Sequence, residues 1–235
     1  MNTHISFKKR GFTLTETVIA IGVVALLITS FIAVFGPARN QIQNVIAREE
    51  ADRLLESLEN EMRTLRPGET YANSFNKAFD WVQGAESTEG AIFLYNYRAD
   101  PSVIRPSDES LGPVASTSAI SGQEAITLPA IRRNSDPLFQ DDATAIQGRV
   151  YYVKLTQLVF DGQGQMVENP GGGGIISDPE TGNPIANPDD YPSAAIALRA
   201  DFYVLPSKDI NYINNNFDAS TYTNPVFSRN IAILR

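Results

Sequence analysis

The clearest pattern in the chain is a long apolar run close to its beginning. The run follows the basic cluster Lys8-Lys9-Arg10, reads FTLTETVIAIGVVALLITSFIAVFG, and carries no charge from Thr17 through Ala38. With residues 12–15 ahead of it, the run reaches the ~20 residues that a helix needs to cross the hydrocarbon core of a bilayer. The basic cluster predicts that the N-terminal end stays in the cytoplasm and that the bulk of the chain lies on the other side.

A cleavable secretory signal and an ordinary single-pass anchor are the alternatives for this run. A secretory signal has an apolar core of roughly 7–15 residues followed by small residues at A-x-A spacing. This run is longer and ends in Val34-Phe35-Gly36-Pro37, which lacks that pattern. Composition alone does not exclude an ordinary anchor.

A second helical pattern begins directly after Gly36-Pro37. Its apolar positions recur at three- and four-residue steps and are Ile42, Val45, Ile46, Leu54, Leu55, Leu58, Met62 and Leu65. This spacing predicts an amphipathic helix whose apolar stripe packs on the chain's own domain. Because the pattern resumes at once, we expect Pro37 to kink the helix without stopping it, whereas Arg66-Pro67-Gly68 ends it. One helix over 12–65 would be about 80 Å long.

Short strand patterns, separated by loops rich in glycine, proline, asparagine and serine, follow residue 67. Alternation is clear at 194–205, where Ile196, Leu198 and Ala200 share one face, as in a half-buried antiparallel strand. The predicted strands are 91–97, 124–128, 149–160, 194–205 and 226–234, and 74–83 is a predicted short helix carrying Trp81. The predicted fold class is α+β, with a long N-terminal helix (membrane-spanning first half, amphipathic second half) packed against a C-terminal antiparallel β-sheet head with long loops.

Three predicted loops, 98–123, 134–147 and 161–193, are long for a compact domain. Loops of this length are usually functional or disordered. The last contains four consecutive glycines at 171–174, but no Gly-Lys-Ser/Thr follows and no helix begins there, which excludes a phosphate-binding loop. A flexible surface loop is the simpler interpretation.

Composition narrows the chemistry that the chain can perform. Its 235 residues suffice for one sizeable domain, and a formal charge of −8 argues against nucleic-acid binding. The sequence has no cysteine, and its one histidine is His4 in the polar leader, so cysteine- and histidine-based catalysis is excluded once a leader is removed. No pair of carboxylates stands out for acid–base work, and we expect no enzymatic activity. The tyrosines Tyr151, Tyr152, Tyr203 and Tyr212 are expected to be packing residues.

The carboxylate of Glu16 lies just inside the apolar run. A charge at the centre of a bilayer costs on the order of 2.5–3.5 kcal/mol, and less near the interface. Its place in the first helical turn lets the helix dipole offset part of that cost. A positive α-amine four residues upstream would offset the rest if the chain were cut between Gly11 and Phe12, where glycine leaves the backbone unobstructed.

This stretch resembles a known signal. Gly11-Phe12-Thr13-Leu14-x-Glu16, after a short basic leader and before a long apolar helix, is similar to the class III signal of type IV pilins and type II secretion pseudopilins. The resemblance covers residues 1–55. It implies that a membrane prepilin peptidase cuts after Gly11, that the same enzyme N-methylates Phe12, and that Glu16 pairs with the Phe12 amine of a neighbouring subunit.

The resemblance also divides the chain. It implies a leader peptide at 1–11, a transmembrane and assembly helix at 12–36, and an exported head at 37–235 that includes the amphipathic half of the helix at 37–66. Loss of the leader removes three basic residues, which leaves the exported part more acidic than the precursor.

By this resemblance the chain is expected to be a structural subunit of a type IV pilus or type II secretion-like filament. The long loops and the absence of a cysteine pair favour a minor pilin or pseudopilin over a major pilin. The implied partners are prepilin peptidase, other pilin or pseudopilin subunits and an inner-membrane assembly platform. The implied location is the inner membrane, single-pass, with the head in the periplasm or outside the cell. The alternative is a membrane-tethered binding or adhesion protein that does not polymerise.

Some pseudopilins bind calcium in a comparable loop region, which makes the acids of 161–193 candidate ligands. These acids are Asp161, Asp178 and Asp189, with Glu180 and Asp190 beside them. Carboxylate oxygens suit calcium, but no EF-hand spacing is present. Calcium is therefore a hypothesis, and no other cofactor is expected.

Overall fold

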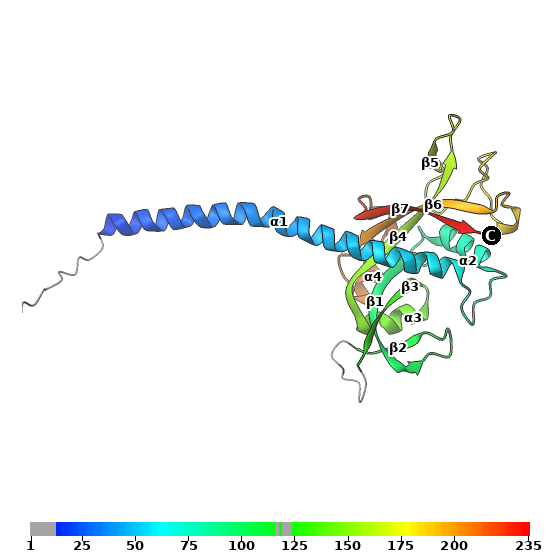
Figure 1. Ribbon diagram of the computed structural model, residues 1–235, viewed down its shortest axis with the longest axis horizontal. Helices are drawn as coiled ribbons and strands as arrows, with labels where there is room; N and C mark the ends of the chain where they lie inside the picture. The colour runs from blue at the N-terminus through cyan, green and yellow to red at the C-terminus, as the bar shows by residue number, and fades with distance from the viewer. Residues whose placement is uncertain (1–12, 116–117, 119–123) are drawn as a thin grey trace, which may run out of the picture. The chain divides into compact units, whose positions relative to one another are not determined.

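The computed structural model describes residues 13–115, 118 and 124–235 (Figure 1). A single helix, α1 (Leu14–Arg63), opens the described chain and passes through Pro37 without a stop, as the pattern predicted. The chain divides into two compact units, Met1–Ile46 and Ala47–Arg235, so the second begins within α1. Each unit is described by itself below.

The second unit is built on a seven-stranded antiparallel sheet. The path through it is β2-β1-β4-β6-β7, while β3 pairs with β1 and β5 pairs with β4. The strands are β1 (Ile92–Ile104), β2 (Leu111–Pro113), β3 (Ile126–Arg133), β4 (Ile146–Phe160), β5 (Met166–Glu168), β6 (Ala195–Val204) and β7 (Phe227–Leu234). The α+β class and the long helix packed against an antiparallel sheet are thereby confirmed.

Short helices with side-chain caps connect these strands. They are α2 (Ser74–Gly84), α3 (Pro137–Asp142) and α4 (Ile210–Asn216), with 3-10 turns η1 (Ala143–Ala145), η2 (Pro188–Asp190) and η3 (Ala219–Thr221). Asn73, Asp136 and Asp209 each accept a backbone N–H from the first turn of the α-helix that follows. Such caps satisfy amides that the helix itself leaves unpaired.

The later part of α1 and helix α2 cover one face of the sheet. Leu54, Leu58 and Met62 of α1 are buried there against the alternating side chains of β4 and β6, such as Leu198 and Phe202. The Tyr151 hydroxyl on β4 also donates to the carbonyl oxygen of Ala47, at 3.0 Å. This face is the predicted core.

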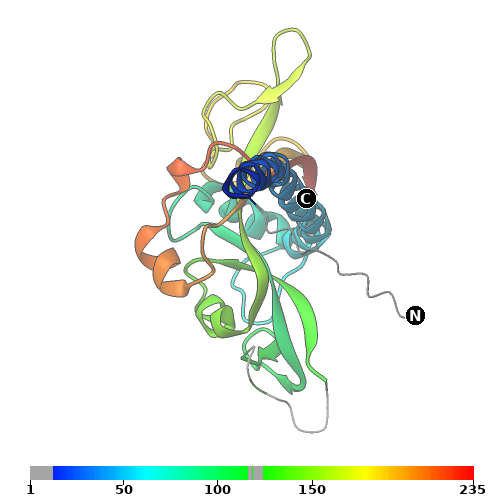
Figure 2. The same cartoon turned by 90° about the vertical axis from the view of Figure 1, so that its left-hand side faces the viewer.

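A second, aromatic core covers the other face, which the sequence did not predict. Phe139 of α3 and Ile213 of α4 are buried against Phe93, Tyr152 and Tyr203 of the sheet. Figure 2 shows α4 in orange and α3 in green on the side of the sheet away from the later part of α1. The sheet is therefore a layer between two cores.

The structure corrects the predicted loops. Region 98–123 contains the end of β1 and strand β2, region 134–147 contains α3 and η1, and region 161–193 contains β5 and η2. The predicted strand at 124–128 begins at Ile126 and continues to Arg133.

The predicted apolar stripe of α1 is wrong at both ends, because Leu65 also lies beyond the end of the helix and is exposed. Ile42, Val45 and Ile46 are exposed, while the small residues Ala47 and Ala51 begin the buried face. Periodicity alone did not reveal this, because the apolar spacing already begins at Ile42, before the point at which the sheet covers the helix.

Candidate functional site

The first half of α1 has no cover from the rest of the described chain. Every described side chain up to Ile46 is exposed, and most of those between Leu14 and Phe35 are apolar. Among the described residues, α1 is the one helix long and apolar enough to cross a membrane. The unit therefore presents a helix whose apolar surface must be met by lipid or by other polypeptide.

Glu16 closes a capping box with Thr13. The Thr13 backbone N–H and the Thr13 hydroxyl both donate to Glu16 Oε2, each at 2.9 Å, and the Glu16 N–H donates to Thr13 Oγ1 at 3.2 Å. The T-x-x-E spacing that signals such a box is visible in the sequence, but the prediction considered only the helix dipole and an α-amine as partners of Glu16. No described group donates to Glu16 Oε1, so one carboxylate oxygen is left for a further partner.

Gly11 and Phe12, the predicted cleavage and methylation residues, lie outside the described residues. The Thr17 hydroxyl donates to the Thr13 carbonyl oxygen at 3.2 Å. This bond to the preceding turn lets a polar side chain sit in an apolar helix.

The structure brings some of the calcium candidates together. Asp161, Asp178 and Glu180 line one hollow of about 430 Å³ beside β5, whereas Asp189 does not line it. Asp161 Oδ1 accepts the backbone N–H groups of residues 163 and 165, and Asp178 Oδ1 accepts those of residues 180 and 181. These bonds make both aspartates turn-forming residues, and no group of three or more acids or histidines that could hold a metal ion is found within 13–115, 118 and 124–235.

The glycine run is half exposed: Gly171 and Gly172 lie at the surface, as expected of a surface loop, while Gly173 and Gly174 lie against residues 83–86 at the end of α2. Gly172 and Gly174 have positive φ angles of 86° and 73°, a backbone region that favours glycine. A Cβ on Gly173 would lie 2.1 Å from Glu86 Oε1. Glycine therefore suits the backbone shape at positions 172 and 174, and at 173 it allows the Glu86 side chain to approach closely.

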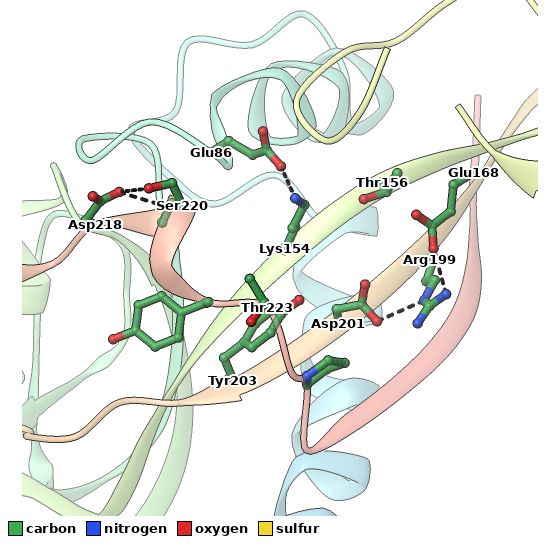
Figure 3. A pocket seen from close by; sticks show the side chains of 13 residues that line it. Glu86, Lys154, Thr156, Glu168, Arg199, Asp201, Tyr203, Asp218, Ser220 and Thr223 are labelled. Carbon is green, nitrogen blue, oxygen red and sulfur yellow. Dashed lines mark hydrogen bonds and ion pairs between the residues drawn. The ribbon is translucent and has the colours of Figure 1, made fainter. Parts of the chain in front are cut away.

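A second hollow, of about 570 Å³, lies on the face of the sheet that carries the aromatic core, beyond the edge of that core (Figure 3). We call it the polar hollow. Its lining residues are Glu86, Lys154, Thr156, Glu168, Arg199, Asp201, Tyr203, Asp218, Ala219, Ser220, Tyr222, Thr223 and Pro225. They come from β4, β5, β6, the segment after α2 and the segment around η3, which explains why no sequence motif announces the site.

The floor of the polar hollow is formed by cross-strand pairs. Tyr152 faces Tyr203, Lys154 faces Asp201, and Thr156 faces Arg199 in the β4–β6 register. Because alternate residues of a strand share a face, these three rows lead outward from the aromatic core into a polar surface.

Each cation of the polar hollow is held by a carboxylate. Lys154 Nζ lies 2.5 Å from Glu86 Oε1, and Arg199 lies 2.6 Å from Glu168 Oε1 and 2.9 Å from Asp201 Oδ1 (Figure 3). These contacts use the donors of Arg199 in a planar fork, the geometry that guanidinium groups favour.

Two tyrosines and one aspartate that line the hollow have shifted pKa values. Burial raises the pKa of Tyr203 to about 12 and that of Tyr222 to about 12, so both phenols are neutral at physiological pH. Hydrogen bonds from the Ser220 side chain and backbone lower the pKa of Asp218 below its usual value, so this carboxylate is ionised.

No family model, no curated protein and no solved structure matches the chain.

Proposed function

We propose that this chain is a structural subunit, a minor pilin or pseudopilin, of a type IV pilus or type II secretion-like filament. In this proposal prepilin peptidase removes residues 1–11 and methylates Phe12. The single-pass helix then holds the subunit in the inner membrane until an assembly platform adds it to other subunits. The supporting observation is a carboxylate at the start of an apolar helix that no described part of the chain covers.

The capping box offsets only part of the free-energy cost of placing the Glu16 charge in a bilayer. A cap contributes about 1 kcal/mol and the helix dipole about 0.3–1 kcal/mol, against on the order of 2.5–3.5 kcal/mol for a charge at the bilayer centre. The cap and dipole suffice near the interface, where the cost is lower. A subunit packed deeper in a helix bundle needs a further positive partner, and Glu16 Oε1 is the oxygen open to one.

Substitution of Glu16 by glutamine tests this role. Glutamine can still accept the capping hydrogen bonds of Thr13, but it carries no charge for an amine. We expect Glu16→Gln protein to be cleaved and to reach the membrane normally, and to be lost from the filament fraction released by shear. Mass spectrometry should find an N-methylated Phe12 terminus in both proteins.

Two control variants separate charge from helix capping. Thr13→Val removes the capping hydroxyl and keeps the carboxylate, and Glu56→Gln removes an exposed charge farther along α1. Both should retain shear-released filaments. Recovery of an intact leader in cells with prepilin peptidase would contradict the cleavage step. A normal amount of Glu16→Gln protein in the filament fraction would show that assembly does not need the Glu16 charge. Absence of the unsubstituted protein from that fraction would instead favour the alternative, a tethered binding or adhesion protein that does not polymerise.

A further inference from the structure

The polar hollow has more acceptors than its own donors can satisfy. Glu86, Glu168, Asp201 and Asp218 supply four carboxylates against the two cations Lys154 and Arg199. In each carboxylate one oxygen carries all the contacts that the structure records. The other oxygen, Oε2 of the glutamates and Oδ2 of the aspartates, receives no hydrogen bond from any residue in the described ranges.

Thr156 gives an independent indication of a ligand. Its side chain lines the hollow between Lys154 and Arg199, and the residue is 3% exposed (Figure 3). No described residue hydrogen-bonds to the Thr156 hydroxyl, and its oxygen keeps accessible surface that opens onto the hollow. The hydroxyl of this otherwise buried side chain can therefore hydrogen-bond a ligand in the hollow, as donor or acceptor.

Aromatic rings complete the lining. Tyr203 and Tyr222 lie edge to face with their ring centroids 5.8 Å apart, and both border the hollow. The face of a tyrosine ring attracts a cation within about 6 Å of its centroid. Excess carboxylate oxygens, an open hydroxyl and aromatic rings all favour a ligand that is positively charged and rich in hydrogen-bond donors.

We propose that the polar hollow binds a cationic nitrogen group, an ammonium or a guanidinium, carried by a partner polypeptide or by a free amine. An ammonium brings three donors and a guanidinium five, with no acceptor, which complements the free oxygens of Glu168, Asp201 and Asp218. A filament subunit and a tethered protein would both present this hollow, so binding does not depend on assembly.

Calorimetric titration of the detergent-solubilised full chain tests the site. The probes are the peptide acetyl-Gly-Arg-Gly-amide, the same peptide with neutral citrulline in place of arginine, and agmatine. We expect saturable one-to-one binding of the arginine peptide and none of the citrulline peptide. Binding of agmatine as tight as that of the peptide identifies a free amine as the source, and tighter peptide binding identifies a side chain.

Matched variants locate the binding. Glu168→Gln and Thr156→Val should each weaken binding of the arginine peptide about tenfold, the usual effect of losing one hydrogen bond to a charged group. Glu180→Gln removes an exposed acid that does not line the polar hollow, and should leave the affinity unchanged. Equal binding of the citrulline peptide, or equal weakening by Glu180→Gln, would overturn the proposal. The proposal would also fail if the hollow bound calcium, in a way that Glu168→Gln weakens, and did not bind the arginine peptide.

Discussion

Lys77 has no exposed surface, and yet each of its three ammonium donors has an acceptor. Its Nζ lies 2.7 Å from Glu61 Oε1, 2.8 Å from Glu69 Oε1 and 2.9 Å from the Thr64 carbonyl oxygen. Arg66 adds a second cation to Glu61, at 2.6 Å. This cluster joins the end of α1 to α2 inside the protein, which sequence did not reveal because a lysine in a short helix is ordinarily solvated.

Substitution of Lys77 by methionine should therefore destabilise the protein. The change removes the cation that Glu61 and Glu69 share. Because Glu61 keeps Arg66 and the Glu69 side chain is 20% exposed, the loss should be about 1–3 kcal/mol, below the roughly 3–5 kcal/mol of an uncompensated buried charge. Guanidinium unfolding followed by the fluorescence of Trp81, the one tryptophan of the chain, measures the loss. Its ring lies 5.2 Å from Lys77 Nζ.

Lys154→Met is the matched control. The Lys154–Glu86 pair is about one-third exposed on both sides, and such pairs contribute about 0–1 kcal/mol. A shift for Lys77→Met no larger than that for Lys154→Met would show that the buried cluster contributes no more than a surface pair.

At the scale of elements, hydrophobic periodicity predicted the segments in which one repeat continues throughout. It missed segments whose exposure changes along the strand or that are buried on both faces. The long helix and the strand at 194–205 were predicted because one repeat holds over many residues. The end of β1 was missed because it contains Pro101 and its last four residues are exposed, which an edge region tolerates. The second core was missed because Tyr151 and Tyr152 both are fully buried, on opposite faces of β4, and an alternating pattern cannot show that.

Of the two candidate sites, one could be found from the sequence and the other could not. Glu16 could be singled out from sequence, because a lone charge in an apolar run is conspicuous. The polar hollow could not, because strand register alone brings Thr156 beside Arg199 and the β4–β5 hairpin brings Glu168 to Arg199. Amino-acid composition does not show which residues of neighbouring strands lie opposite one another.

The turn after α2 depends on close approach at a glycine. A Cβ on Gly90 would lie 2.3 Å from the carbonyl oxygen and 2.7 Å from the carbonyl carbon of Gly84. Backbone atoms cannot swing away as a side chain can, so Gly90→Ala should cost about 1–3 kcal/mol, as overpacking does. Thermal unfolding monitored by circular dichroism measures this, and Gly162→Ala, which would meet nothing within 4 Å, is the control. Equal melting temperatures for the two variants would show that the turn has room to relax.

At the scale of the molecule, the boundary within α1 separates two different physical tasks. Residues 14–46 contribute no buried side chain, whereas the part of α1 from Ala47 onward supplies a wall of the core. A protein that begins at Ala47 should therefore fold in buffer without detergent. Trp81 fluorescence should report a cooperative thermal transition, and size-exclusion chromatography should show no aggregate.

A protein that begins at Thr64 is the informative comparison, because it differs from the protein that begins at Ala47 only by loss of the buried part of α1. Removal of Leu54, Leu55, Leu58 and Met62 uncovers one face of the sheet. Burial of each contributes about 1.5–3 kcal/mol, and their sum is comparable with the ~5–15 kcal/mol by which proteins are usually stable. We expect this shorter protein to aggregate or to melt without cooperativity. If both proteins melted alike, α1 would only rest on the head, and if the protein from Ala47 required detergent, residues 14–46 would belong to its fold. If only the protein that begins at Ala47 melted cooperatively, the boundary would lie at residue 47. An uncovered apolar helix would precede it, and an α+β head that folds by itself would follow it.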